Sequence, residues 1–160
     1  MSEVKPDWAK ITEALKAPFA ATEVDWRVQG KSNAEGKSQV LAYIDARAVQ
    51  ERLDAVVGPE NWSFDWQPVV TNDQSLLVAK GTLTIHGVSK SDVGDASNFE
   101  GNKGTISDTL KRCGVMWGIA RYLYDLPQVW ITLEKGKIPE ATLKQLQARL
   151  AARGQEKKAS

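Results

Sequence analysis

Residues 103–127 read KGTISDTLKRCGVMWGIARYLYDLP, and the spacing of their apolar residues predicts one long helix. At about 100° per residue, a narrow apolar stripe runs along this helix, which is typical of a surface that faces a core. The stripe consists of Ile106, Leu110, Cys113, Trp117, Ala120 and Tyr124. Apolar residues also lie on both flanks of the stripe. We therefore expect other elements to cover this helix on several sides and take it as the centre of the fold.

Two adjacent cations, Lys111 and Arg112, interrupt the apolar pattern in the middle of this helix. Burying an unpaired cation is costly, so each side chain must reach a carboxylate, solvent or an anionic partner. An ion pair with Asp108 or a solvated helix face would explain them without any ligand. We favour a phosphate backbone as the partner, because bases on a rigid helix lose little side-chain entropy on binding.

The rest of the chain alternates between helical and strand patterns without an internal repeat. The predicted order is a helix at 6–16, strands at 23–30 and 38–44, a helix between Asp45 and Gly58, strands at 62–70, 76–86 and 88–93, the central helix, a short strand at 129–133 and a helix at 139–153. This is a β-β-α-β-β-β-α core between flanking N- and C-terminal helices. It predicts the α+β class, with an antiparallel β-meander packed on the long central helix in one sheet.

Finer predictions follow from local patterns. Thr105 and Asp108 resemble a capping box that opens the central helix, and Arg121 and Asp125 suit an ion pair within it. The glycine-rich residues 101–104 around Lys103 indicate either a phosphate cradle or a flexible linkage. Tryptophans at positions typical of a core are Trp62, Trp66 and Trp117.

Length and composition are those of one soluble domain. The 160 residues predict a single domain over residues 1–153 and a disordered tail at 154–160. The formal net charge is only +1, so nucleic-acid binding would depend on a local basic track. No apolar run approaches the ~20 residues of a membrane span, and we expect no membrane partner. The single cysteine, Cys113, suits a core position and a cytoplasmic protein.

Enzyme classes find little support in the sequence. His86 is the only histidine, and no zinc spacing, P-loop, GxSxG or HExxH motif occurs. Several aspartates lie in predicted strands and turns, but without the constellation of a magnesium-dependent nuclease. We therefore expect no catalytic residue, no metal and no cofactor. A pure protein-interaction module is the other class left open, because the sheet edges and the leucine-rich last helix would support it.

Motifs in a fixed order resemble those of the Rad52 single-strand annealing family. They are Tyr43-Ile44-Asp45-Ala46-Arg47, Gly58-Pro59-Glu60-Asn61-Trp62, Asp92-Val93-Gly94, and the stretch from Lys103 through Ser107-Asp108 and Leu110-Lys111-Arg112 to Trp117-Gly118 and Arg121-Tyr122-Leu123-Tyr124. The resemblance covers residues 41–126. In length and in the phrase GPENWSFDW, the chain is most similar to the bacterial DNA-damage-response members of the family.

This resemblance implies a ring of identical subunits that pair their sheet edges and carry single-stranded DNA along a basic groove. By position, Arg47, Lys111 and Arg112 match the bases of the inner groove, and Lys103 matches a lysine before the central helix. Val115 stands where the family has a third helical base, and the lysines of the outer, duplex-handling site have no match.

The sequence therefore predicts a non-enzymatic, single-stranded DNA-binding protein of DNA repair that protects DNA ends within a homo-oligomeric ring. The alternative is an active single-strand annealing recombinase of the phage type. A metal-dependent nuclease and a pure interaction module are less favoured. Near-neutral subunits can still build a continuous positive channel, because a ring repeats their four cations.

Overall fold

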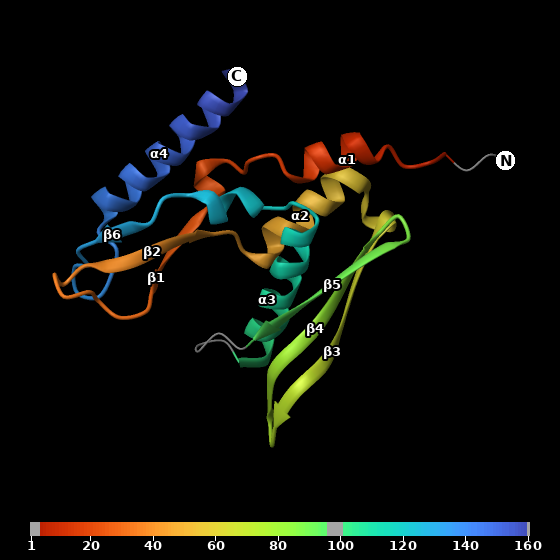
Figure 1. The fold of residues 1–160 in the computed structure, drawn as a ribbon, viewed down its shortest axis with the longest axis horizontal. Helices are drawn as coiled ribbons and strands as arrows, with labels where there is room; N and C mark the ends of the chain where they lie inside the picture. The colour runs from red at the N-terminus through yellow and green to blue at the C-terminus, as the bar shows by residue number, and fades with distance from the viewer. Residues whose placement is uncertain (1–3, 96–100, 160) are drawn as a thin grey trace. The chain divides into compact units, whose positions relative to one another are not determined.

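The computed structural model describes residues 4–95 and 101–159, with side chains placed for all of these except 101 and 154–159. The chain divides into two compact units. The single domain over residues 1–153 stays a prediction. The first unit comprises Met1–Ala17 and Asp45–Arg121, and the second Pro18–Ile44 and Tyr122–Ser160. Figure 1 shows their elements. The described residues hold two antiparallel sheets of three strands each, rather than the single sheet predicted.

The sheet of the first unit is the predicted meander. Its strands are β3 (Trp62–Asn72), β4 (Ser75–Ile85) and β5 (Val88–Asp95), in that spatial order. His86 and Gly87 form the two-residue connection between β4 and β5, with φ angles of 46° and 79°. Two successive left-handed residues are the signature of a type I′ turn, whose twist matches that of the strands it joins. The predicted break at Gly87 is thus confirmed.

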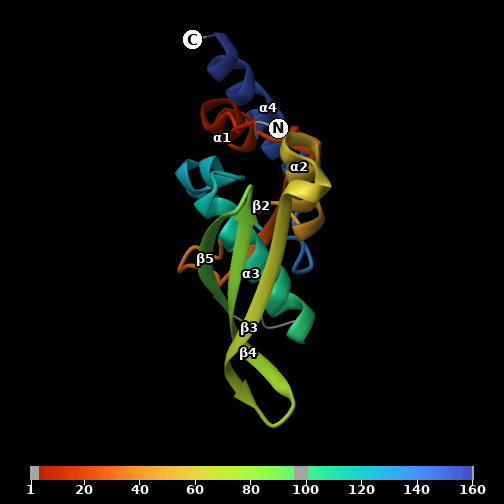
Figure 2. The same cartoon turned by 90° about the vertical axis from the view of Figure 1, so that its right-hand side faces the viewer.

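The central helix, α3 (Gly101–Met116), packs directly on β4 and β5. In both Figure 1 and Figure 2 it lies along one face of this sheet. The contact is close because two strand positions that face Thr109 are glycines, Gly81 and Gly94. A Cβ atom at Gly94 would lie 2.7 Å from the Thr109 backbone nitrogen. Thr105, buried one turn earlier, donates its hydroxyl to the Leu76 carbonyl oxygen at 3.0 Å. Thr105 therefore anchors the helix to β4 instead of capping its first turn.

The helix ends at Met116, so the prediction that it runs to residue 127 is wrong. Gly118, with φ at 95°, turns the backbone, and its N–H and that of Ile119 donate back to the carbonyls of Val115 and Gly114, both at 2.9 Å. Such a glycine C-cap closes a helix because glycine adopts the left-handed conformation without steric cost. Beyond the cap the helical spacing no longer holds, and Tyr124, predicted to face the core, is 71% exposed.

Arg121 completes this cap. Its guanidinium donates to the Val115 carbonyl through Nε at 3.0 Å and through Nη2 at 2.7 Å, and to the Met116 carbonyl at 3.0 Å. These are carbonyls that the end of a helix leaves without intrahelical donors. The predicted intrahelical pair of Arg121 with Asp125 is therefore wrong, because the helix needed for that spacing has already ended.

Two further helices, α1 (Trp8–Leu15) and α2 (Ala46–Val57), belong to the first unit. As predicted, Asp45 caps α2, accepting from the Ala48 N–H at 2.8 Å, and Gly58 ends it. The indole of Trp8 stacks on that of Trp117 at 5.8 Å, which places Trp117 in the core. Trp66, by contrast, is 39% exposed and lies on the edge strand β3.

The second unit contains β1 (Asp25–Gln29), β2 (Ser38–Tyr43) and β6 (Val129–Ile131), in the order β1-β2-β6, and the helix α4 (Glu140–Ala159). Val40, Ile131 and Leu146 form its core. The described residues also form the 3₁₀ turns η1 (Ala21–Glu23), η2 (Pro59–Asn61, in the first unit) and η3 (Arg121–Asp125).

The last helix begins one residue later than predicted and extends to Ala159, past the expected end at 153. Gly154 is the only helix-disfavouring residue in this extension, and one interior glycine costs only about 1 kcal/mol. Residue 160, the end of the expected tail, lies outside the described residues. None of the helices described is both long and apolar enough to cross a membrane.

Candidate nucleic-acid interface

Arg112 lies on the exposed side of α3 and is held there by Asp108, one turn earlier. The Arg112 Nε atom lies 2.8 Å from Asp108 Oδ2, and the same oxygen accepts the Asp95 backbone N–H at 3.2 Å. The ion pair that the sequence left open is thus present, and it is made through the Nε–H donor of the guanidinium. The Arg112 side chain is 46% exposed. An exposed pair at this spacing contributes little stability, so its main effect is to orient the arginine.

Lys111 is the next residue on the helix, about 100° around its axis from Arg112. Its side chain is half-buried. Thr109 points at the sheet, so Lys111 leaves the helix on the side away from β4 and β5. Neither cation is sealed inside the fold. The two side chains place adjacent positive charges, which we call the basic step, on a helix whose backbone is packed tightly on the sheet.

Arg47 lies on the neighbouring helix, in the first turn of α2, and is exposed. The two helices meet where Val49 approaches Gly114: a Cβ atom at Gly114 would lie 3.3 Å from Val49 Cγ1. Arg47 precedes Val49 by two residues, and Lys111 precedes Gly114 by three. The structure therefore places Arg47 and Lys111 on two packed helices, each within one turn of the contact between them.

Lys103 is exposed in the first turn of α3, eight residues before Lys111, which corresponds to about 12 Å along the helix. The surrounding glycine-rich residues are helical, and Gly104 is buried. Asn102 accepts the Leu76 N–H at 2.6 Å and ties this first turn to β4. The glycine-rich stretch is therefore neither an open loop that cradles a phosphate nor a flexible linkage. Lys103 shares a helix with Lys111 and Arg112 but lies about two turns from them.

Lys90 is a cation that the sequence analysis missed. It lies on the face of β5 that faces α3, with its Nζ atom 4.5 Å from the centroid of the Trp117 ring and donating to the Met116 carbonyl at 3.3 Å. A cation at this position complements the negative end of the helix dipole. The sequence contained a signal for this position, because the alternation of side chains along β5 places residue 90 on the inward face. Its engagement with Trp117 and Met116 indicates a structural role.

Within the described residues, neither Cys113 nor the acidic side chains offer a centre for nucleophilic or metal chemistry. Cys113 is fully buried, and burial raises the pKa of its thiol, so the thiolate needed for nucleophilic attack is disfavoured. Among the residues that the structure describes, no group of three or more histidine, cysteine or acidic side chains could hold a metal ion. The arrangement of Arg47, Lys103, Lys111 and Arg112 on two helices is suited to holding a polyanion.

Comparison with known proteins identifies the class. Residues 7–141 match the family described as Rad52/22 family double-strand break repair protein. Because this match covers most of the chain, the chain belongs to that family, and the relationship predicted from its motifs is confirmed.

The chain is also similar to two proteins called single-stranded DNA-binding protein DdrA. It is 44% identical to the one from Deinococcus deserti over 131 residues, which are 79% of this chain and 63% of the relative. It is 42% identical to the one from Deinococcus radiodurans over 122 residues, which are 75% of this chain and 57% of the relative. The chain thus spans about three fifths of the length of these relatives. The predicted similarity to bacterial DNA-damage-response members is confirmed.

Proposed function

We propose that this protein binds single-stranded DNA in DNA repair, with Lys111 and Arg112 as the centre of the binding site. The observation that carries the proposal is the placement of two adjacent cations on a helix that Gly81 and Gly94 lock against a sheet. Arg47 and Lys103 extend this basic surface on the same two helices. The names of the two relatives support the same function.

The proposed contacts are electrostatic and independent of DNA sequence. An arginine engages a phosphate through two parallel donors, whereas a lysine acts as a point charge. Phosphates along a flexible strand follow such cations, and the bases remain available for stacking or pairing. Neither a metal nor a cofactor takes part, and the protein binds without cleaving the strand. It works in the cytoplasm, as its single cysteine led us to expect.

The finer part of the proposal is a closed ring of identical subunits that protects DNA ends. Support comes from the β3-β4-β5 sheet, in which β3 and β5 are the edge strands of the single chain. Val69 on β3 and Val93 on β5 are 56% and 50% exposed. An edge strand presents unpaired backbone groups, and head-to-tail pairing of two different edges generates a ring when the rotation closes. A ring would align the basic steps of successive subunits into one channel.

Fluorescence anisotropy of a labelled single strand across a salt series, with magnesium in half of the samples, tests the function. Counterion release predicts that affinity falls steeply with salt and that binding does not require magnesium. Salt-insensitive or absent binding would favour the interaction module. Shortening of the strand only in the magnesium samples would favour a nuclease.

Annealing is the competing function within the same family. Val115 stands at the position of the family's third helical base, which reduces the positive charge available to hold two strands. We therefore propose binding without efficient annealing. Mixing complementary strands with and without the protein measures this directly: the pairing rate should change little, and a strong acceleration would establish the recombinase instead.

A further inference from the structure

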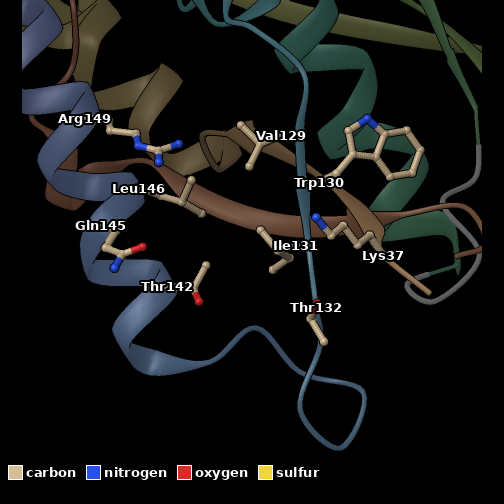
Figure 3. A pocket seen from close by; sticks show the side chains of 9 residues that line it. All are labelled: Lys37, Val129, Trp130, Ile131, Thr132, Thr142, Gln145, Leu146 and Arg149. Carbon is tan, nitrogen blue, oxygen red and sulfur yellow. The ribbon is translucent and has the colours of Figure 1, made fainter. Parts of the chain in front are cut away.

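The second unit contains a groove that the proposed function does not use. It lies between α4 and β6, and Figure 3 shows the part that adjoins Lys37. Two neighbouring pockets of about 280 and 530 Å³ make up the groove, and both are lined by Val129, Leu146 and Arg149. The larger volume is in the range of sites that hold small ligands. All of its lining residues belong to the second unit.

Local packing explains which side chains reach the groove. Leu146 packs on Val40 and Ile131 in the core of this unit, which turns one face of α4 toward the sheet. Arg149 and Arg153 follow Leu146 at intervals of three and four residues, and therefore lie near the same helix face. In Figure 3, Arg149 extends from α4 toward β6. Lys37 reaches the same strand from the β1–β2 connection, because Ser38 pairs with Ile131.

The charged side chains that line the groove are all positive. Its lining includes Lys37, Arg149 and Arg153 and contains no aspartate or glutamate, although the whole chain has 20 acidic against 21 basic residues. Within the part of the chain whose side chains are described, no carboxylate forms an ion pair with Lys37 or Arg149. A concave surface with several cations and no acid attracts anions.

The groove also has an apolar wall, so a simple anion would not fill it and its ligand should carry apolar groups as well. Trp26, Leu150 and Val129 line the larger pocket beside Arg149 and Arg153. The indole N–H of Trp26 is buried without a hydrogen-bond partner among the described residues. Trp130 also borders both pockets, but Figure 3 shows its indole directed to the other side of β6, away from α4. A ligand that fits this lining is an anion with flat apolar groups.

We infer that the α4–β6 groove binds a second segment of single-stranded DNA, with phosphates held by Lys37, Arg149 and Arg153 and a base against the wall of Trp26 and Leu150. This inference rests on the proposed function, since it assigns to the same strand an additional contact in the second unit. A nucleotide chain combines phosphates with apolar bases at short intervals, and base–aromatic stacking is independent of sequence. An acidic peptide would match the cations but not the apolar wall.

The test compares two double variants of the full chain that lose the same charge. Lys37→Gln/Arg149→Gln removes two cations of the groove. Lys135→Gln/Lys144→Gln removes two exposed cations that line neither pocket, Lys144 being on α4 itself and paired with Glu140 at 3.6 Å. Affinity for a labelled single strand is measured by anisotropy between 50 and 300 mM salt, conditions that we choose so that counterion release can be resolved. Circular dichroism checks that both variants remain folded.

We expect the groove variant to bind roughly tenfold more weakly at 150 mM salt, with a salt slope shallower by about 1.4, because each lost phosphate contact removes about 0.7 from the slope for a single strand. The control variant should keep the slope of the unmodified protein. Equal slopes for both variants, beside tight binding by the unmodified protein, would overturn the inference and leave the proposed function intact. No binding by the unmodified protein would refute the proposed function itself.

A second readout locates the strand directly. Light-induced crosslinking of a strand that carries 5-iodouracil, followed by mass spectrometry of the peptides, should yield adducts in residues 126–153 or 26–37 in addition to those around α3. Adducts confined to the first unit would overturn the inference. Polyglutamate is also tested as a competitor of the labelled strand. If it competes for the unmodified protein but not for the groove variant, and no such adducts form, the occupant of the groove is an acidic peptide. That result would also overturn the inference.

Discussion

Arg112 is both ion-paired and exposed, and this combination is the central fact at the scale of single residues. Asp108 holds its Nε atom at 2.8 Å, while nearly half of the side chain remains exposed. A pair of this kind restricts the arginine to a few rotamers before any ligand arrives, so less entropy is lost on binding. The neighbouring Lys111, which is half-buried, shares the rigid backbone of α3.

Replacing Arg112 or Lys111 by alanine should weaken single-strand binding by roughly 1–3 kcal/mol per subunit site, the usual effect of losing one charged contact. Lys16→Ala is the matched control, because Lys16 is exposed in the same unit and paired with Glu13 at 2.9 Å. Anisotropy measures the affinity and native mass spectrometry the assembly. If either variant falls to monomers with unchanged affinity per subunit, these residues hold the interface and our site assignment is wrong.

Because of Cys113, the stability of the first unit should decrease at alkaline pH. Burial raises the pKa of its thiol in the folded protein above the unfolded value of about 8.5. The unfolded chain therefore loses its proton first as the pH rises. The free energy of unfolding contributed by this group is fully present below pH 8.5 and declines as the pH rises toward the folded pKa.

Urea unfolding between pH 7 and pH 10 tests this coupling. The unmodified protein should lose stability more steeply than Cys113→Ala, with a difference in slope of up to about 1.4 kcal/mol per pH unit above pH 8.5. Lysine and tyrosine ionisation affects both proteins equally and cancels in the comparison. Identical slopes would mean that the thiol ionises in the fold as readily as in the unfolded chain.

At the scale of elements, the decisive feature is how α3 is seated and how it ends. Gly81 and Gly94 allow the backbone at Thr109 to approach the sheet, and Arg121 with Gly118 closes the helix at Met116. The basic step at Lys111 and Arg112 lies between these two points. Its geometry is therefore determined from both ends.

Gly94→Ala should destabilise the first unit by about 1–3 kcal/mol, because the new Cβ meets backbone atoms of Thr109 at 2.7 and 2.8 Å and the helix must shift. Gly81→Ala meets only the side chains of Thr109 and Phe64. Adding Thr109→Ala should therefore rescue a larger part of the loss at Gly81 than at Gly94, where the backbone atoms of Thr109 remain in the way. Urea denaturation of the four variants measures this, and equal rescue at both positions would show that the backbone does not set the spacing.

Arg121→Ala should cost about 1–2 kcal/mol of unfolding free energy, since the carbonyls of Val115 and Met116 lose a charged donor. Asp125→Ala serves as its control and should have almost no effect on the thermal midpoint. If the two substitutions destabilise the protein equally, Arg121 and Asp125 act as the pair that the sequence suggested, and the cap is unimportant.

At the scale of the whole molecule, the chain builds two units that each combine distant segments. The four predicted site residues all belong to the first unit, whereas the α4–β6 groove belongs to the second. In the proposed ring, function would depend on how many copies assemble, because one subunit carries a formal net charge of only +1. Repetition around a ring would convert a few cations per subunit into a continuous positive path.

Adding a charge to an exposed sheet edge should block this assembly. Val69→Lys or Val93→Lys should shift the protein to smaller species in native mass spectrometry, since a lysine on an edge strand opposes pairing with another strand. Val4→Lys, at a residue that is 94% exposed and outside every strand, should leave assembly unchanged. A full-sized oligomer from both edge variants would exclude pairing through this sheet.

Local patterns in the sequence were enough for much of the fold. The meander with its break at Gly87, the capped helix after Asp45 and the α+β class follow from turn chemistry and periodicity, which act over a few residues. They do not reveal long-range pairing. The union of β2 with β6, some ninety residues apart, and the resulting second sheet were therefore missed. Similarly, Arg149 carries no local signal that sets it apart from other arginines on an exposed helix.

What the sequence determined alone is the family, through motifs in a fixed order, and the adjacency of Lys111 and Arg112, which is a covalent fact. Packing between distant segments set the rest: α3 ends at Met116, Arg112 is held by Asp108 yet exposed, and Lys37 and Arg149 line one groove. The physical reason is that neighbours along the chain constrain backbone angles, whereas burial and the convergence of charges depend on packing between segments that the sequence separates.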